Sequence, residues 1–276
     1  MIKVELPNDL PPEILRWQQE AQRITQQILQ AQTQVEKNTL IDQNQRHWRN
    51  PDLIKWLSDL NFEKCWFTET KFGGDYQEVE HFRPKKGTKE ADGSTCANHN
   101  GYYWLAFELS NYRLCKRRPN AKKGTFFPIC DNRFRAITPQ DAWSDETPYF
   151  LDPLKESDVL LLSFNDNGIP VPQENIGEID TKRVNFTIEK WFLDERVLNS
   201  RRAETWRTIR ALYAKYLNAI SEANQNGSVA KRAEAEETLI RIKELCSKKS
   251  EFSSVAREAL MKMPDRMAWT IVSRLT

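Results

Sequence analysis

The stretch Glu78-Val79-Glu80-His81-Phe82-Arg83-Pro84-Lys85 decides the fold of this chain. Val79 and His81 alternate with Glu78 and Glu80, and this period of two predicts a short β-strand. The residue before a proline is restricted to extended geometry, so we expect the strand to end near Arg83. Glu80 and His81 would point to opposite sides of a flat strand. Both side chains can therefore address one site only if the chain twists or ends there, and a Glu-His pair alone is more often a surface or structural feature.

The region that follows this stretch is strongly basic, although the whole chain of 276 residues has a formal net charge of only +2. From His81 to Arg135 there are twelve Lys or Arg and four acids, a local balance of +8, so the rest of the chain carries −6. Six of the nine glycines lie between Gly73 and Gly124, which indicates that turns and loops are concentrated in the same region. The sequence thus predicts an irregular, basic module in the middle of the chain.

Helical periodicity marks the N-terminal side of this module. Apolar residues three and four apart run from Ile14 to Val35, after a Pro11-Pro12 pair where a helix can begin. A second short helix is expected from about Asn50, with Leu53, Trp56, Leu57 and Leu60 on one face. We therefore expect an N-terminal helical segment at residues 1–62.

The same period returns beyond about residue 180. Two further helices are expected around 230–246 and 251–263, the second ended by Pro264, and an Asn-Asp-Asn-Gly turn lies within 149–172. We expect an α+β chain that is mainly α, with a core at 63–150 and a C-terminal helical segment at 151–276.

Composition excludes two classes of protein. No apolar stretch approaches the about 20 residues that a membrane span needs, and the first ten residues have no signal-peptide pattern, so we expect a cytoplasmic protein with no membrane partner. The five cysteines are irregularly spaced and form no C-x-x-C pair, which argues against a disulfide framework.

Two further motifs follow His81 in order: Asn111, then Asn120-Ala121-Lys122-Lys123-Gly124. With Glu80-His81-x-x-Pro84 they resemble the HNH, or ββα-metal, nuclease motif. In that family a β-hairpin carries an acid followed by His, a loop Asn braces the hairpin, and a helix contributes a third polar ligand. Within that family, the sequence resembles the branch that includes the nuclease subunit of the Septu anti-phage system. The resemblance is carried by five segments: Val79 to Lys85, Tyr103-Trp104-Leu105-Ala106-Phe107, Phe127-Pro128-Ile129, Cys65 to Glu69 and Leu151-Asp152-Pro153. The resemblance implies an HNH finger embedded between the N- and C-terminal helical segments.

The resemblance also implies roles for individual residues. His81 would be the general base, because a neutral imidazole can take a proton from water near neutral pH. Glu80 and the amide oxygen of Asn120 would hold a divalent metal, and hard oxygen ligands suit Mg²⁺ or Mn²⁺. Asn111 would hydrogen-bond backbone across the loop and orient His81, and Lys123 would lie closest to the scissile phosphate.

Each of these residues also has a simpler interpretation. Asn111 is compatible with a turn or helix cap, Asn120 after Pro119 with a helix N-cap, and Glu80 with an ion pair to Arg83. The three motifs occur in the same order as in HNH nucleases and at similar spacing, and this combination favours the nuclease interpretation.

The sequence departs from the family pattern in its cysteines. Many members carry two C-x-x-C pairs that hold structural zinc, whereas here Cys65 is followed by Thr68, and Pro119 stands where a cysteine is common. Structural zinc is therefore not expected, and we interpret Cys65, Cys115 and Cys130 as small buried hydrophobic residues. His99 lies in an apparent loop insertion at 86–101, and we expect it to be solvated.

Six cationic side chains fall within the eleven residues from Arg113 to Lys123, with no acid among them. Such a run is usually a solvated face, but here it adjoins Asn120 and can neutralise phosphates without reading sequence. We expect DNA as a partner, bound by Arg83, Lys85, Arg113, Lys116, Arg117, Arg118 and Lys122. The Septu resemblance implies an ATPase partner subunit as well, docked on helices within 200–263. The alternatives are a non-catalytic nucleic-acid-binding module with a degenerate finger, or a subunit that only docks a partner.

Overall fold

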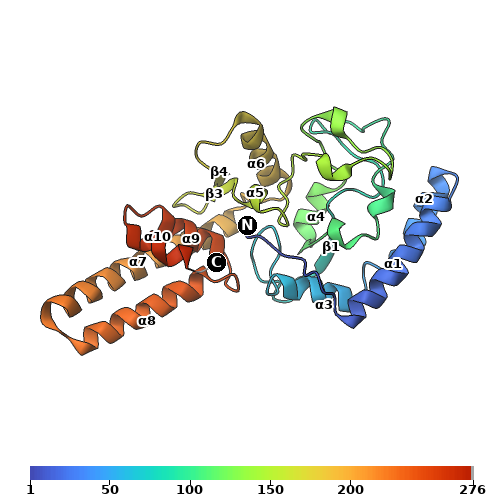
Figure 1. Ribbon diagram of the computed structural model, residues 1–276. Helices are drawn as coiled ribbons and strands as arrows, with labels where there is room; N and C mark the ends of the chain where they lie inside the picture. The colour runs from blue at the N-terminus through green and yellow to red at the C-terminus, as the bar shows by residue number, and fades with distance from the viewer. Residues whose placement is uncertain (275–276) are drawn as a thin grey trace.

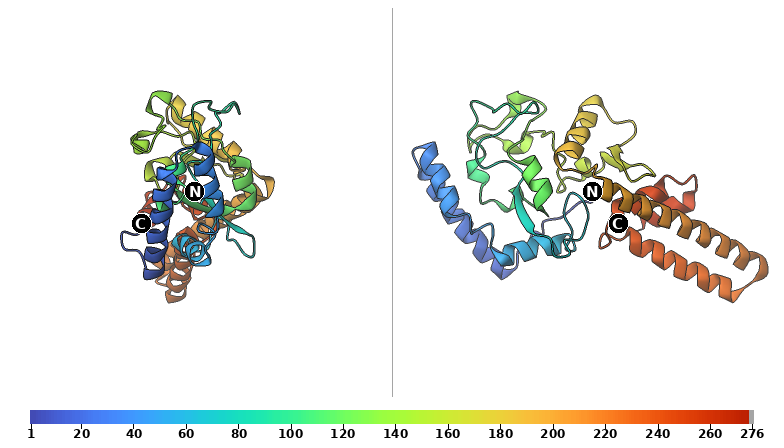
Figure 2. Two further views of the ribbon diagram at one scale, coloured as in Figure 1. Left: turned by 90° about the vertical axis from the view of Figure 1, so that its right-hand side faces the viewer. Right: turned by 180° about the vertical axis from the view of Figure 1, so that it is seen from behind.

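The computed structural model describes residues 1–274, and the chain runs through three regions in sequence order (Figure 1). Helices α1–α3 lie at one end, the irregular region with β1 and α4 lies in the middle, and the antiparallel pair α7 and α8 projects at the other end. The views of Figure 2 agree with this arrangement. The expectation of a mainly helical α+β chain is confirmed, with two small two-stranded sheets in the described part.

The N-terminal helices are α1 (Pro12–Gln30), α2 (Gln34–Gln43) and α3 (Pro51–Leu60). The expected apolar stripe of α1 is buried, at Ile14, Trp17, Ala21, Ile24 and Ile28. The helix does not continue to Val35, however. Thr33 accepts a hydrogen bond from the Glu36 backbone and Glu36 bonds back, so this capping box starts a new helix, and Val35 is 74% exposed.

The middle region contains a ββα unit. Strand β1 (Gln77–His81) pairs antiparallel with β2 (Tyr112–Lys116), with Gln77 opposite Lys116 and His81 opposite Tyr112. Helix α4 (Arg117–Lys123) follows β2 without an intervening loop. The strand predicted from the alternation around His81 is thus present, and its partner comes from more than thirty residues further along the chain.

The connection between β1 and β2 is ordered by aromatic packing. It holds the short helices η1 (Tyr103–Leu105) and η2 (Leu109–Asn111), and Phe82, Tyr102 and Phe127 pack edge to face. Trp104 and Phe107 are also buried. The expectation that His99 is solvated is wrong: it is 4% exposed, with Nε2 2.9 Å from the Ala136 carbonyl oxygen.

Trp191 of the C-terminal region packs on the segment that precedes β1, where its ring stacks on Phe67 with 3.6 Å between centroids. The middle region ends with η3 (Asn132–Phe134) and η4 (Trp143–Asp145). The C-terminal region contains α5 (Glu156–Val159), β3 (Leu162–Phe164), β4 (Pro170–Pro172), α6 (Glu178–Lys190), α7 (Arg196–Asn226), α8 (Val229–Cys246), α9 (Ser253–Met261) and α10 (Arg266–Ser273). The Asn-Asp-Asn-Gly turn joins β3 and β4. Gly168 of that turn has φ +72°, and a Cβ there would lie 2.3 Å from the Asn199 carbonyl oxygen, so the turn and α7 fit together only with glycine. Among residues 1–274 no helix combines the length and apolar character needed to cross a membrane.

Candidate functional site

A cleft of about 770 Å³ lies between the N-terminal helices and the ββα unit. One wall comes from α2, α3 and the turn between them, with Trp48 and Arg49. The opposite wall comes from β1 and α4. Of the residues predicted from sequence, the cleft brings together Glu80, His81, Lys85, Arg117 and Asn120.

His81 is held in one orientation at the end of β1. Its Nε2 lies 2.9 Å from the Ala106 carbonyl oxygen, and a carbonyl can only accept, so Nε2 carries the hydrogen. Trp48 and Tyr112 contact the ring edge to face, with centroids 4.9 and 5.2 Å away, and the Tyr112 hydroxyl donates to the same carbonyl. The lone pair is therefore on Nδ1.

The electrostatics around His81 keep the imidazole neutral. Burial lowers its pKa well below the ordinary value of 6.5, and the positive charge of Lys85 lowers it further. Lys85 Nζ lies 3.4 Å from His81 Nδ1 and 4.9 Å from the centre of the Trp48 ring. Burial also lowers the pKa of Lys85 to about 8. The site thus presents a neutral imidazole nitrogen next to a cation.

Glu80 and His81 are the last two residues of β1, and both line the cleft. The Glu80 carboxylate accepts a hydrogen bond from Lys123 Nζ, which also donates to the His81 carbonyl oxygen at 2.9 Å. Burial raises the pKa of Glu80 despite the attraction of Lys123, and burial lowers the pKa of Lys123. Lys123 is fully buried, so the expectation that it lies nearest a bound phosphate is wrong: it lies behind Glu80 and neutralises it.

Asn120 faces β1 from the middle of α4, so the helix N-cap interpretation is wrong. Its Nδ2 donates to Glu78 Oε2 at 2.7 Å, and Arg117 Nε lies 3.8 Å from the other oxygen of Glu78. With the amide nitrogen engaged, the amide oxygen is the group of Asn120 that can accept a cation or a donor.

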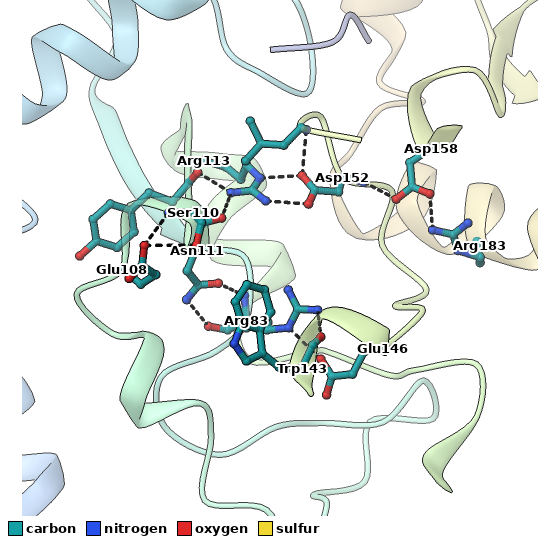
Figure 3. A network of polar contacts seen from close by, with 12 residues as sticks. Arg83, Glu108, Ser110, Asn111, Arg113, Trp143, Glu146, Asp152, Asp158 and Arg183 are labelled. Atoms are coloured by element: carbon teal, nitrogen blue, oxygen red, sulfur yellow. Dashed lines mark hydrogen bonds and ion pairs between the residues drawn. The ribbon is translucent and has the colours of Figure 1, made fainter. Parts of the chain in front are cut away.

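Asn111 ties the end of β1 to the loop that returns to β2 (Figure 3). Its Oδ1 accepts from the Arg83 backbone N–H at 2.8 Å, and its Nδ2 donates to the carbonyls of Arg83 and Leu105, both at 3.0 Å. The Phe82 N–H donates to the Asn111 carbonyl oxygen at 2.8 Å. The side chain therefore spans the loop, as a brace for the segment next to His81 requires.

Two arginines predicted to bind nucleic acid are instead internal. Arg113 is 2% exposed, and its guanidinium bonds both carboxylate oxygens of Asp152, at 2.7 and 2.6 Å (Figure 3). Burial alone would raise the pKa of Asp152, but Arg113 outweighs it and holds that pKa below its ordinary value. Arg83 is 5% exposed and bonds Glu146 at 2.7 Å, so its suggested pair with Glu80 is absent too. Both arginines stabilise the fold and present no charge to a ligand.

The other predicted cations are placed differently. Arg117, Arg118 and Lys122 are exposed on α4, and Lys116 pairs with Asp75 at 2.7 Å. Arg118 and Lys122 cover the Phe192 ring at 4.8 and 5.1 Å. The basic run therefore divides into a buried part that holds the fold and an exposed part on α4.

The donor set fits a weakly held, largely hydrated cation better than a closed metal centre. Within residues 1–274 no three side chains of His, Cys, Asp or Glu are grouped as a metal cage. The cleft does offer hard oxygen donors on one wall, from Glu78, Glu80 and Asn120, and such donors suit Mg²⁺ or Mn²⁺ that keeps several waters. A cation on Glu80 would share that carboxylate with Lys123. Of the cysteines, Cys65 and Cys115 are buried and Cys130 is half-buried, all three as free thiols.

Sequence reasoning missed the contacts that fix the imidazole. Trp48 lies in the N-terminal segment, outside every motif, and nothing in its local pattern indicated contact with His81. Tyr112 follows Asn111 directly, and its place opposite His81 becomes readable only once the strand register is known.

Comparison with known proteins gives one informative similarity. No family model matches the chain. The chain is 31% identical to the Septu protein PtuB of Bacillus mycoides over 160 residues, which are 57% of this chain and 52% of that protein. The chain thus spans about half the length of this relative, and the similarity supports a relation to Septu proteins.

Proposed function

We propose that this Septu-related chain is a metal-dependent HNH endonuclease that hydrolyses DNA, and that it serves as the nuclease component of an anti-phage defence system. The observation that carries the proposal is the orientation of His81. Its Nε2–H is committed to the Ala106 carbonyl, and its Nδ1 lone pair, 3.4 Å from the Lys85 ammonium, lies at a cleft that also holds Glu80 and Asn120.

The residues of the cleft can supply the base, the phosphate-binding groups and the metal ligands that phosphodiester hydrolysis needs. His81 Nδ1 takes the proton from the attacking water, and its Nε2–H bond to Ala106 becomes stronger as the ring gains charge. Exposed Arg117 and half-buried Lys85 face the cleft and can bind phosphate oxygens. Glu80 and the amide oxygen of Asn120 would hold Mg²⁺ or Mn²⁺, which would supply positive charge for the phosphate and the leaving oxygen. Two protein ligands imply weak metal binding without substrate.

A cleavage assay with matched histidine variants tests the proposal. His81→Gln keeps a donor for the Ala106 carbonyl but removes the base. His47→Gln is the control, because it alters a half-buried imidazole whose Nε2 lies 3.0 Å from the Trp17 carbonyl oxygen. Plasmid and linear DNA are incubated with and without Mg²⁺ or Mn²⁺, with the neighbouring gene product present or absent. We expect metal-dependent breaks by wild type and His47→Gln, and at least about a hundredfold loss in His81→Gln. Undiminished cutting by His81→Gln removes His81 from the mechanism.

One observation favours the alternative of a non-catalytic binding module. The ammonium of Lys123 already neutralises Glu80, as it would in a finger that no longer needs a cation. The same assay separates the two functions, because a pure binder shows DNA affinity with no divalent-ion requirement and no strand breaks.

We propose that an ATPase partner, implied by the Septu resemblance, docks on the projecting pair α7 and α8 (Figure 1). Val229 and Ile240 on α8 are 80% and 57% exposed. Val229→Glu with Ile240→Glu should abolish co-elution with an ATPase encoded next to this chain. Retained co-elution would assign docking to another surface.

A further inference from the structure

A second groove, of about 440 Å³, opens beside the cleft at the start of α4. It lies between the ββα unit and the beginning of α7, and its lining includes Tyr76, Arg117, Arg118, Phe192, Glu195 and Leu198. Two of these residues, Tyr76 and Arg117, also line the cleft that holds His81. The two hollows therefore share a rim, and a chain-like ligand can pass from one to the other.

Tyr76, on the shared rim, presents an aromatic ring to solvent. It is 79% exposed, whereas most aromatic residues in the middle region are buried. It directly precedes β1, five residues before His81. A free ring face beside a catalytic cleft can stack on a planar group, and stacking on bases tolerates every base because each has a π face.

The cations around the groove are only loosely neutralised. Arg117 lies 3.8 Å from Glu78, and Arg118 lies 3.9 Å from Glu195, whose other oxygen caps α7. Their side chains are 75% and 68% exposed. Lys116 is paired with Asp75 at 2.7 Å and Arg201 with Glu251 at 2.6 Å, so the guanidinium groups of Arg117 and Arg118 are the least neutralised positive charges of the groove.

Apolar side chains from α4, α7 and the turn after α6 line the groove. Phe192 ends the turn after α6 with φ +51°, a left-handed backbone that is uncommon for an aromatic residue. Its ring lies under the Arg118 guanidinium, 4.8 Å away, and Pro119, Val197 and Leu198 add apolar surface. An apolar floor with cations at the rim suits a ligand with a flat apolar part and an anionic backbone.

We propose that this groove binds one unpaired nucleotide of the strand that occupies the cleft. Its base stacks on Tyr76, and its flanking phosphates contact Arg117 and Arg118. The inference rests on the proposed function, and it names the substrate class: single-stranded or locally opened nucleic acid. Bases inside a duplex are stacked on each other, so they cannot offer a face to Tyr76.

Binding measurements in the His81→Gln background separate this inference from cleavage. A labelled single strand and the duplex of the same sequence are titrated with the full chain and Mg²⁺. Tyr76→Ala should weaken single-strand binding by roughly 5- to 100-fold, the range of one base–aromatic stack, and leave duplex binding unchanged. Tyr76→Phe, which keeps the ring, and Trp269→Ala, which removes a 59%-exposed aromatic on α10 outside both hollows, should bind as the parent does.

An abasic scan then identifies the contact. Single strands with one missing base at successive positions should show one position where affinity drops, and Tyr76→Ala should remove that drop. The inference is overturned, while the nuclease proposal stands, if the affinity is the same for every abasic position. It is also overturned if Tyr76→Ala weakens single-strand and duplex binding equally. Binding with the expected dependence on Tyr76 but no cutting by wild type overturns the nuclease proposal alone, and no binding of either nucleic acid overturns both.

Discussion

Replacing Asn111 by alanine removes three buried hydrogen bonds at once, and this loss should be measurable as stability. Its side chain accepts from the Arg83 N–H and donates to the carbonyls of Arg83 and Leu105, at 2.8, 3.0 and 3.0 Å. Each such bond contributes about 1 kcal/mol net, so Asn111→Ala should lower the free energy of unfolding by about 3 kcal/mol. Asn111 is 3% exposed, so little water can replace the lost partners.

Two further variants make the measurement specific. Asn111→Asp keeps the acceptor for the Arg83 N–H but turns a carboxylate toward two carbonyls, so it should destabilise by at least as much as alanine. Ser110→Ala removes a hydroxyl whose bond, 3.3 Å to Glu108, is exposed, and it should change stability by less than about 0.5 kcal/mol. Urea unfolding followed by circular dichroism gives the three values, with a constant slope as the check on comparable unfolded states.

Asn111→Ala also tests whether the Asn111 side chain orients His81 for catalysis. If the brace orients His81, cleavage by folded Asn111→Ala should fall more than its DNA affinity does, since binding depends on exposed cations on α4. The reasoning is refuted if both Asn111 variants unfold within about 0.5 kcal/mol of wild type. It is also refuted if cleavage and DNA affinity fall in equal proportion.

Three other predictions follow from buried groups. Arg113→Met leaves a buried carboxylate without its partner and should cost about 3–5 kcal/mol of stability by urea unfolding; a cost under about 1 kcal/mol would contradict a structural role. Burial lowers the pKa of His47 and of His99 below 6.5, so the unfolded chain takes up protons that the folded chain does not, and stability should fall as pH drops below about 6.5. Midpoints of urea unfolding from pH 8 to 5 measure this fall, and a flat profile would contradict the prediction. Gly168→Ala should destabilise by about 2–4 kcal/mol through its positive φ and the close Asn199 carbonyl, whereas Gly177→Ala, with open space around it, should cost less than about 1 kcal/mol; equal melting temperatures of the two variants would refute the packing argument.

Much of the local structure is readable from the sequence because it depends on periods of two and 3.6 residues. The alternation before Pro84 predicts the strand, and the apolar stripe of α1 predicts which of its residues are buried. The break after Gln30 was missed because the stripe continues across it, and only the Thr33 capping box marks the new helix. The order of the motifs also pointed to Asn111 as a brace, and its hydrogen bonds have the form that this role requires.

Only the tertiary structure decided which charged side chains are exposed and which are buried in ion pairs. Arg83, Arg113 and Lys123 look like members of one basic surface, yet each is buried against an acid 63, 39 or 43 residues away in sequence. Trp48 likewise reaches His81 from a separate helical segment. The sequence by itself determined the strand at His81, most of the helices and the order of the chemical groups. Partners that distant meet only when many segments pack together, and the cost of desolvation then favours placing these three cations next to carboxylates.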